Sequence, residues 1–194
     1  MSYIAQPFNL VSSTIPYFYR CDIKTSQICD QEITYDQFEF IFSKVEVFYL
    51  NNCVVRNKND EIVPLEKLVK TLPKIEKIHF QDTTSCSSIT SNTVKELLKI
   101  PHFSKITEVV LWEIPEKFDL ETFYIYFKKN KHTNFRLHFA DSLSEAYKIL
   151  LEAIVDEIIA AENHGYKIPY FYFAGLQNEK WEKVDLLICQ QNKQ

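Results

Sequence analysis

The chain has 194 residues, with 22 basic and 26 acidic side chains, and this length suits one compact domain or a short repeat array. Its 46% apolar and 25% charged residues are typical of a globular protein, and its net charge of −4 argues against a broad nucleic-acid-binding surface. The only glycines are Gly165 and Gly175, which excludes the Gly-rich loops of nucleotide-binding folds and the G-x-S-x-G motif of many hydrolases.

The first 44 residues are less regular than the rest of the chain. We expect a strand over residues 23–28 and a helix over residues 35–42, ahead of the first clear repeat. The sequence is therefore divided into an N-terminal capping segment, residues 1–44, and a repeat domain, residues 45–194. Together they are expected to form a single compact unit.

From residue 45 onward the sequence repeats a strand pattern, apolar-x-x-apolar-x-apolar-x-x-apolar. The first copy consists of Val45, Phe48, Leu50 and Cys53, and further copies, some incomplete, begin at residues 75, 106, 134 and 168. The leading positions are 28 to 34 residues apart. The alternating centre of each copy predicts a strand with one buried face.

Helical patterns follow these strands. They cover residues 64–72, 93–100, 119–130, 142–161 and 179–190. The first pattern begins at a proline, which suits the first turn of a helix, and Asp119 is placed to cap the third. Ser142 and Glu145 have the spacing of a capping box at the start of the longest helix, and Gly165 is expected to form a left-handed stop after it.

Strands that alternate with helices predict parallel pairing through crossover connections. We therefore expect an α/β fold, a leucine-rich-repeat-like solenoid of about five strand-helix units with a curved parallel sheet. A doubly wound sandwich is the alternative. Its strands would be buried on both faces and uniformly apolar, whereas the strands predicted here alternate apolar with polar residues.

Several segments carry a family resemblance. They are VFYLNNC at residues 47–53, IVPLEKL at 62–68, LPKI at 72–75, ITYDQF at 33–38 and IVDEII at 154–159. In these segments the chain resembles the repeat region of nematode F-box proteins, and the resemblance extends over residues 20–180. In proteins of that kind an F-box docks on the Skp1 adaptor of a cullin-RING ubiquitin ligase, and the following domain selects the protein to be ubiquitinated.

The resemblance implies protein recognition without catalysis. Residues 1–20 are shorter than an F-box and lack its leucine-proline opening. We therefore expect the substrate-binding part of an F-box-type ubiquitin ligase receptor, or a derivative that lost the F-box. Skp1 and cullin are expected as partners only if the full-length protein has an F-box. The alternative is a small-ligand-binding protein or an enzyme with a pocket at the strand ends.

Residues between the buried strand positions define the second face of the sheet, which solenoids use for binding. In the register of the repeats they form three rows. The rows are Val47, Lys77, Glu108, Arg136 and Tyr170; Tyr49, His79, Val110, His138 and Tyr172; and Asn51, Gln81, Trp112, Ala140 and Ala174.

Eight residues of these rows are predicted to bind a protein, because aromatic and Arg side chains are frequent hot spots of interfaces. They are Tyr49, Lys77, His79, Trp112, Arg136, His138, Tyr170 and Tyr172. The alternative is that Trp112 and the tyrosines pack beneath a helix or the C-terminal segment.

The sequence offers no catalytic, metal or cofactor motif. His79 and His138 lie two strands apart in the predicted register without a third ligand, which makes a poor zinc site. Cys86 lies in a polar run with no indicated base, and Cys53 and Cys189 lie among apolar residues as expected core thiols. We expect no enzyme activity, no metal and no cofactor.

The expected location is the cytoplasm or the nucleus. Five scattered cysteines without a C-x-x-C pair suit a reducing compartment. The most apolar stretch, residues 146–161, contains four charged residues, so it does not suit a membrane span. The expected partners are proteins, with no role for nucleic acid or membrane.

Overall fold

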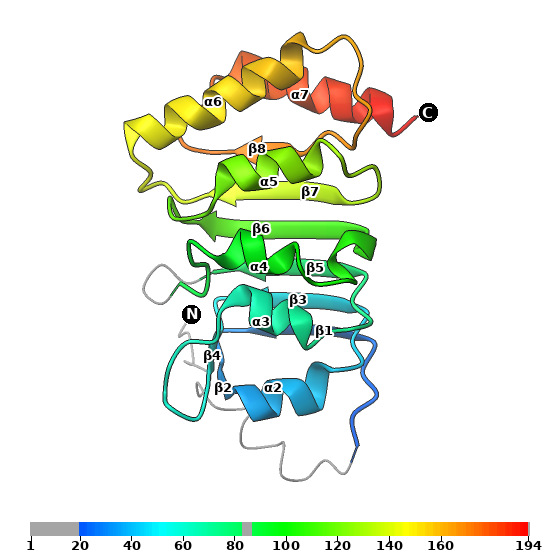
Figure 1. Ribbon diagram of the computed structural model, residues 1–194, viewed down its shortest axis with the longest axis vertical. Helices are drawn as coiled ribbons and strands as arrows, with labels where there is room; N and C mark the ends of the chain where they lie inside the picture. The colour runs from blue at the N-terminus through cyan, green and yellow to red at the C-terminus, as the bar shows by residue number, and fades with distance from the viewer. Residues whose placement is uncertain (1–19, 83–86, 194) are drawn as a thin grey trace, which may run out of the picture.

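The chain forms an α/β fold, described here by a computed structural model for residues 20–82 and 87–193. Six strands make a parallel sheet in which the spatial order follows the chain order (Figure 1). The strands are β1 (Thr25–Cys29), β3 (Val47–Asn51), β5 (Lys77–Gln81), β6 (Glu108–Ile114), β7 (Asn134–Phe139) and β8 (Tyr170–Tyr172). Two short strands, β2 (Glu32–Thr34) and β4 (Val54–Arg56), pair in parallel as a second sheet.

Helices follow the strands along the chain. They are α2 (Tyr35–Phe42), α3 (Leu65–Lys70), α4 (Thr93–Leu97), α5 (Leu120–Phe127), α6 (Glu145–Ala160) and α7 (Asn178–Gln191), with a 3-10 turn η2 (Phe103–Lys105). Figure 1 shows α2 to α5 one above another on the near face of the sheet, with α6 and α7 at the C-terminal end. All crossovers up to β7 therefore run over one face of the sheet.

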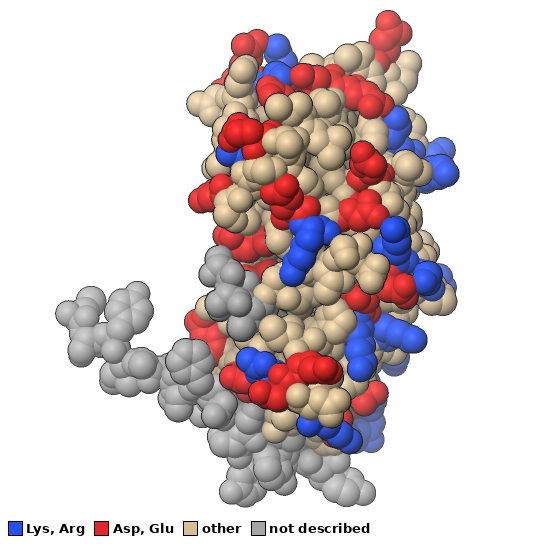
Figure 2. All heavy atoms as spheres, turned by 60° about the vertical axis from the view of Figure 1, so that its left-hand side comes forward, with Lys and Arg blue, Asp and Glu red and all other residues tan. Residues whose placement is uncertain are grey.

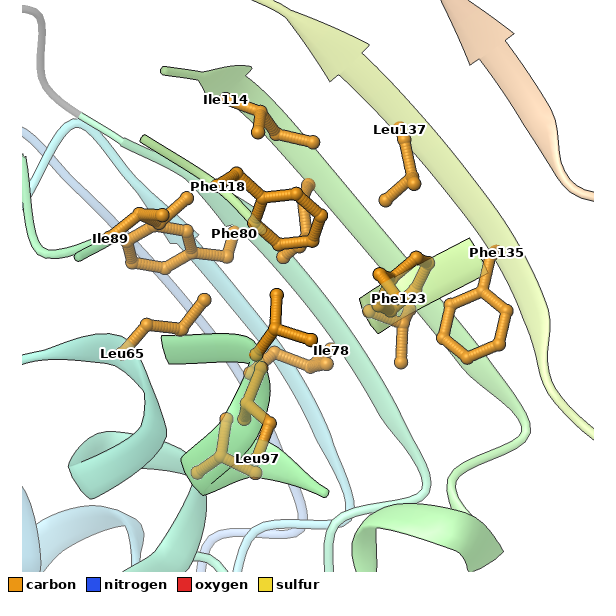
Figure 3. Packing of buried hydrophobic residues seen from close by; sticks show 14 of the residues in the cluster. Leu65, Ile78, Phe80, Ile89, Leu97, Ile114, Phe118, Phe123, Phe135 and Leu137 are labelled. Atoms are coloured by element: carbon orange, nitrogen blue, oxygen red, sulfur yellow. The ribbon is translucent and has the colours of Figure 1, made fainter. Parts of the chain in front are cut away.

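The core lies between the sheet and these helices. Alternate strand residues such as Phe48, Ile78 and Leu137 point toward the helices and are buried. Figure 3 shows Ile78 and Leu137 facing side chains from the helical layer, among them Leu97 and Phe123. Buried side chains from Ile33 to Val184 form one continuous cluster. The strand before residue 45 joins the same sheet, so the predicted capping segment supplies its edge.

The predicted register is wrong by two residues between β6 and β7. Val109 lies opposite Phe135 and Leu111 opposite Leu137, whereas the repeats had aligned Val109 with Leu137. A bulge in β6, where Glu113 has φ 58°, then adds one residue to that strand. A shift of two residues leaves each side chain on its predicted face, because strand side chains alternate with a period of two.

Hydrogen bonds before β7 explain this register. The side-chain oxygen of Asn130 accepts from the backbone N–H of Thr133, and the Thr133 hydroxyl donates to the Ile106 carbonyl. Both residues are buried. These contacts hold the start of β7 against the start of β6 and so set the register. The predicted register was based on apolar residues alone and did not include Asn130 and Thr133.

Two predicted helix ends also differ. The N-cap of α6 is Ser144, whose hydroxyl accepts from the Tyr147 N–H, so the predicted capping box at Ser142 and Glu145 is wrong. The helix ends at Ala160, and the next residue is extended, before the predicted stop at Gly165. Asp119 caps α5 as predicted, by accepting from the Thr122 N–H.

Candidate functional site: the exposed face of the sheet

All eight predicted binding residues lie on the face of the sheet turned away from the core. They alternate along their strands with buried residues of the core cluster, and none of them belongs to it. We call this surface the exposed sheet face. It includes Tyr49, Lys77, His79, Glu108, Val110, Trp112, Arg136, His138, Tyr170 and Tyr172.

The corrected register changes which of these residues meet. Arg136 lies between Val110 of β6 and Tyr170 of β8, whereas the predicted row had placed Glu108 beside it. Trp112, in the bulge of β6, stacks on His138, with ring centroids 3.5 Å apart and planes 11° apart. Trp112 nevertheless stays 42% exposed. Large flat side chains that remain accessible at the centre of a face are what interface hot spots use.

Tyr170 and Tyr172 complete the aromatic group around His138. Their ring centroids lie 5.4 Å and 5.8 Å from that of His138. Tyr172 is 48% exposed, whereas the hydroxyl of Tyr170 accepts a 2.6 Å hydrogen bond from the indole N–H of Trp181 on α7. The expected alternative, packing beneath the C-terminal segment, therefore applies to Tyr170 and not to Trp112 or Tyr172.

A second group lies toward the N-terminal half of the sheet. The rings of Tyr49 and His79 are 4.4 Å apart, and His79 Nε2 lies 2.5 Å from Glu108 Oε1. Both side chains of the His79–Glu108 pair are about one quarter exposed. Lys77 extends beyond this pair into solvent, and none of the described carboxylates lies within 4 Å of its ammonium group.

Helix α7 borders the exposed sheet face at its C-terminal end. Lys180 of α7 pairs with Glu152 and Asp156 of α6, and Val184 is the buried anchor of the helix. A hollow of about 340 Å³ remains between α7 and the strands. Its lining consists of His79, Val110, Trp112, Arg136, His138, Tyr170, Asp185 and Ile188.

The sequence prediction missed the contribution of α7. It placed a helix over residues 179–190 but assigned none of its residues to the site. Trp181, Asp185 and Ile188 reach the exposed sheet face only through the packing of α7 against α6 and β8. The available signal was Trp181, which stands among charged residues in the first turns of this helix.

Burial lowers the pKa of His138 to about 4, and the nearby charge of Arg136 acts in the same direction. The stacked indole ring of Trp112 is part of the cover that removes the imidazole from water. His138 is therefore neutral at neutral pH. It can donate and accept hydrogen bonds but adds no charge to the hollow.

This lowered pKa predicts a pH dependence of stability. His138 has its ordinary pKa of 6.5 in the unfolded chain and about 4 in the folded one, so the unfolded state takes up the proton first. Stability is expected to fall as the pH is lowered from about 6.5 to about 4. The His138→Gln variant lacks the titrating imidazole. As the pH falls through this window, the wild type should therefore lose unfolding free energy that the variant keeps. A constant difference between the two proteins in urea unfolding would contradict the prediction.

On the side toward which the strands of Figure 1 point, Figure 2 shows both acidic and basic side chains, separated by neutral surface. Several charged side chains of the described residues form exposed ion pairs, such as Lys99 with Glu96 and Lys128 with Glu157. Such a surface offers little attraction to a polyanion.

Another hollow, of about 350 Å³, lies at the carboxyl ends of β2 and β4. Its charged side chains already have partners, since Arg56 Nε lies 2.6 Å from Glu32 Oε1 and Lys58 Nζ lies 3.2 Å from Asp36 Oδ2. The alternative expected from the sequence, a small-ligand site, requires a hollow at strand ends, and this one has that position.

The thiols follow the prediction only in part. Cys53 is buried, and burial raises the pKa of its thiol to about 11. Cys189 is exposed rather than buried, because α7 turns it away from α6 and the sheet. Cys86 lies outside the described residues. Over the described part of the chain, no three His, Cys, Asp or Glu side chains are grouped so that they could hold a metal ion.

None of the helices within residues 20–82 and 87–193 combines the length and the apolarity needed to cross a bilayer. Comparisons with protein-family models, with curated proteins and with solved structures gave no match. The exposed sheet face and its chemistry are therefore the basis on which a function is proposed.

Proposed function

We propose that this chain is a leucine-rich-repeat-like recognition domain that binds another protein through the exposed sheet face. One observation carries the proposal. Parallel sheets are nearly always covered on both faces. Of the described helices, however, only α7 reaches this face, and it lies along one border of it. A parallel sheet with accessible Trp112 and Tyr172 is what a solenoid presents to a partner.

The strand order supports the solenoid part of the proposal. Each strand of the large sheet pairs with its neighbour in chain order, whereas a doubly wound sheet reverses its order at one point. The helices from α2 to α5 lie on one face, as repeated strand-helix units require.

The biological setting of the proposal comes from the resemblance to nematode F-box proteins. The domain would be the substrate-binding part of an F-box-type ubiquitin ligase receptor, or of a derivative without an F-box, in the cytoplasm or nucleus. It would select a protein by non-covalent contacts and perform no catalysis. Four described cysteines are free thiols, which suits such a compartment.

Site-specific photo-cross-linking tests this proposal. A benzoylphenylalanine is introduced in place of Tyr172 on the exposed sheet face or, as the control, in place of Ile149, which is 66% exposed on α6. After irradiation in a nematode extract, we expect position 172 and not position 149 to capture a specific protein. Mass spectrometry then separates a ligase substrate or Skp1 and cullin from an unrelated partner.

Capture from position 149 alone would place the interface elsewhere and contradict the proposal. Capture from neither position would favour the small-ligand alternative at the ends of β2 and β4. The assignment to a ubiquitin ligase fails separately if the captured protein is neither ubiquitinated nor associated with Skp1 and cullin.

A further inference from the structure

Arg136 differs from the other two arginines of the chain. Arg20 pairs with Asp22, and Arg56 Nε lies 2.6 Å from Glu32 Oε1. Within the described residues, no carboxylate lies within 4 Å of Arg136, although it lines a hollow of about 340 Å³. A guanidinium group can offer a carboxylate two parallel N–H donors, so Arg136 has binding capacity that the chain leaves unused.

Apolar side chains line part of the hollow around Arg136. Val110 lies beneath it and is only 3% exposed, so neighbouring side chains already cover it. Trp112 and Tyr170 line it from the strands, and Ile188 lines it from α7. Arg136 itself is exposed, so its guanidinium group is accessible to a partner.

The other charged and titratable groups around the hollow leave the charge of Arg136 without a partner. Glu108 belongs to the neighbouring row, and its carboxylate is hydrogen-bonded to His79, which lines the hollow. His138 is neutral at neutral pH, and the charge that acts on it is that of Arg136. Asp185, on α7, is the one carboxylate in the lining, and it has no ion pair with Arg136. The strand side of the hollow thus favours an anion, whereas Asp185 limits its affinity.

We infer that this hollow binds an acidic side chain, Asp or Glu, of the protein partner, with its carboxylate on Arg136 and its stem against the exposed indole ring of Trp112. The inference rests on the proposed function and adds the chemistry of the residue that the partner must supply. Asp185 opposes the bound carboxylate from the α7 side, so its removal should strengthen binding.

A random 12-residue peptide library displayed on phage tests the inference. Selection on the wild-type protein should enrich peptides with Asp or Glu at one shared position. In the best peptide, replacing that residue with Gln or Asn should weaken binding to the wild type at least about tenfold. When the same peptide replacement is measured on the Arg136→Gln variant, the affinity should fall by less than about twofold. The two changes remove the same interaction, so their effects are not additive. The Asp185→Asn variant should bind the acidic peptide about twofold to fivefold more tightly.

Lys77→Gln is the matched control, since it removes another unpaired cation of the exposed sheet face that does not line the hollow. Equal losses in Arg136→Gln and Lys77→Gln, with unchanged melting of both, would reduce the effect to general charge attraction and overturn the inference. So would enriched peptides without an acidic position, or a selection that enriches none. These results would leave the cross-linking at position 172 untouched, so they are distinguishable from failure of the proposed function.

Discussion

Replacing Phe127 with alanine is expected to lower the free energy of unfolding by about 3–5 kcal/mol. Phe127 lies at the end of α5, is fully buried, and contacts Tyr124, Tyr166 and Phe171 with ring centroids 5.0 to 5.9 Å away. It therefore connects a helix, a loop and β8, and its loss leaves a cavity that these rigid neighbours cannot fill. A domain of this kind has a total stability of about 5–15 kcal/mol, so the variant loses a large share of it.

Ile125→Ala is the matched control for Phe127→Ala. It lies on the same helix but is 58% exposed, and its replacement should change the unfolding free energy by no more than about 0.5 kcal/mol. Urea unfolding followed by circular dichroism measures both variants. Similar losses in the two would show that α5 does not contribute to the core as described.

The strands were predictable from the sequence because burial on one face leaves an alternating pattern. Residues 47–51, 77–81 and 108–114 follow it, and the structure forms strands there. Pairing between β6 and β7 was not predictable in the same way. It depends on Asn130, Thr133 and the bulge at Glu113, which are polar residues that an apolar pattern ignores.

The candidate site was predictable to the level of the sheet face but not of its contacts. Trp112 and His138 were both assigned to this face, yet their stacking follows from the corrected register. Asp185 and Ile188 were missed because α7 reaches the face through tertiary packing, which no local pattern encodes. The pair β2 and β4 was missed for a different reason, since three residues carry too little periodicity to predict a strand.

Replacing Trp112 with alanine is expected to weaken partner binding by about 2 kcal/mol or more, which is about 30-fold. The indole ring presents a large accessible surface and is held in place by its stacking on His138. Because its orientation is fixed before binding, little side-chain entropy is lost when a partner covers it. The backbone carbonyl of Trp112, which accepts from the Asp82 N–H, is retained in the variant, so the fold should persist.

The most direct test of the account compares the affinities of three proteins for the partner captured at position 172. Isothermal titration calorimetry of the wild type, Trp112→Ala and Ile149→Ala should give a loss of about 30-fold for Trp112→Ala and less than about twofold for Ile149→Ala. All three proteins should still unfold cooperatively, which shows that each has an intact fold. Equal affinities of the three, with intact folds, would contradict the claim that the exposed sheet face is where this protein recognises its partner.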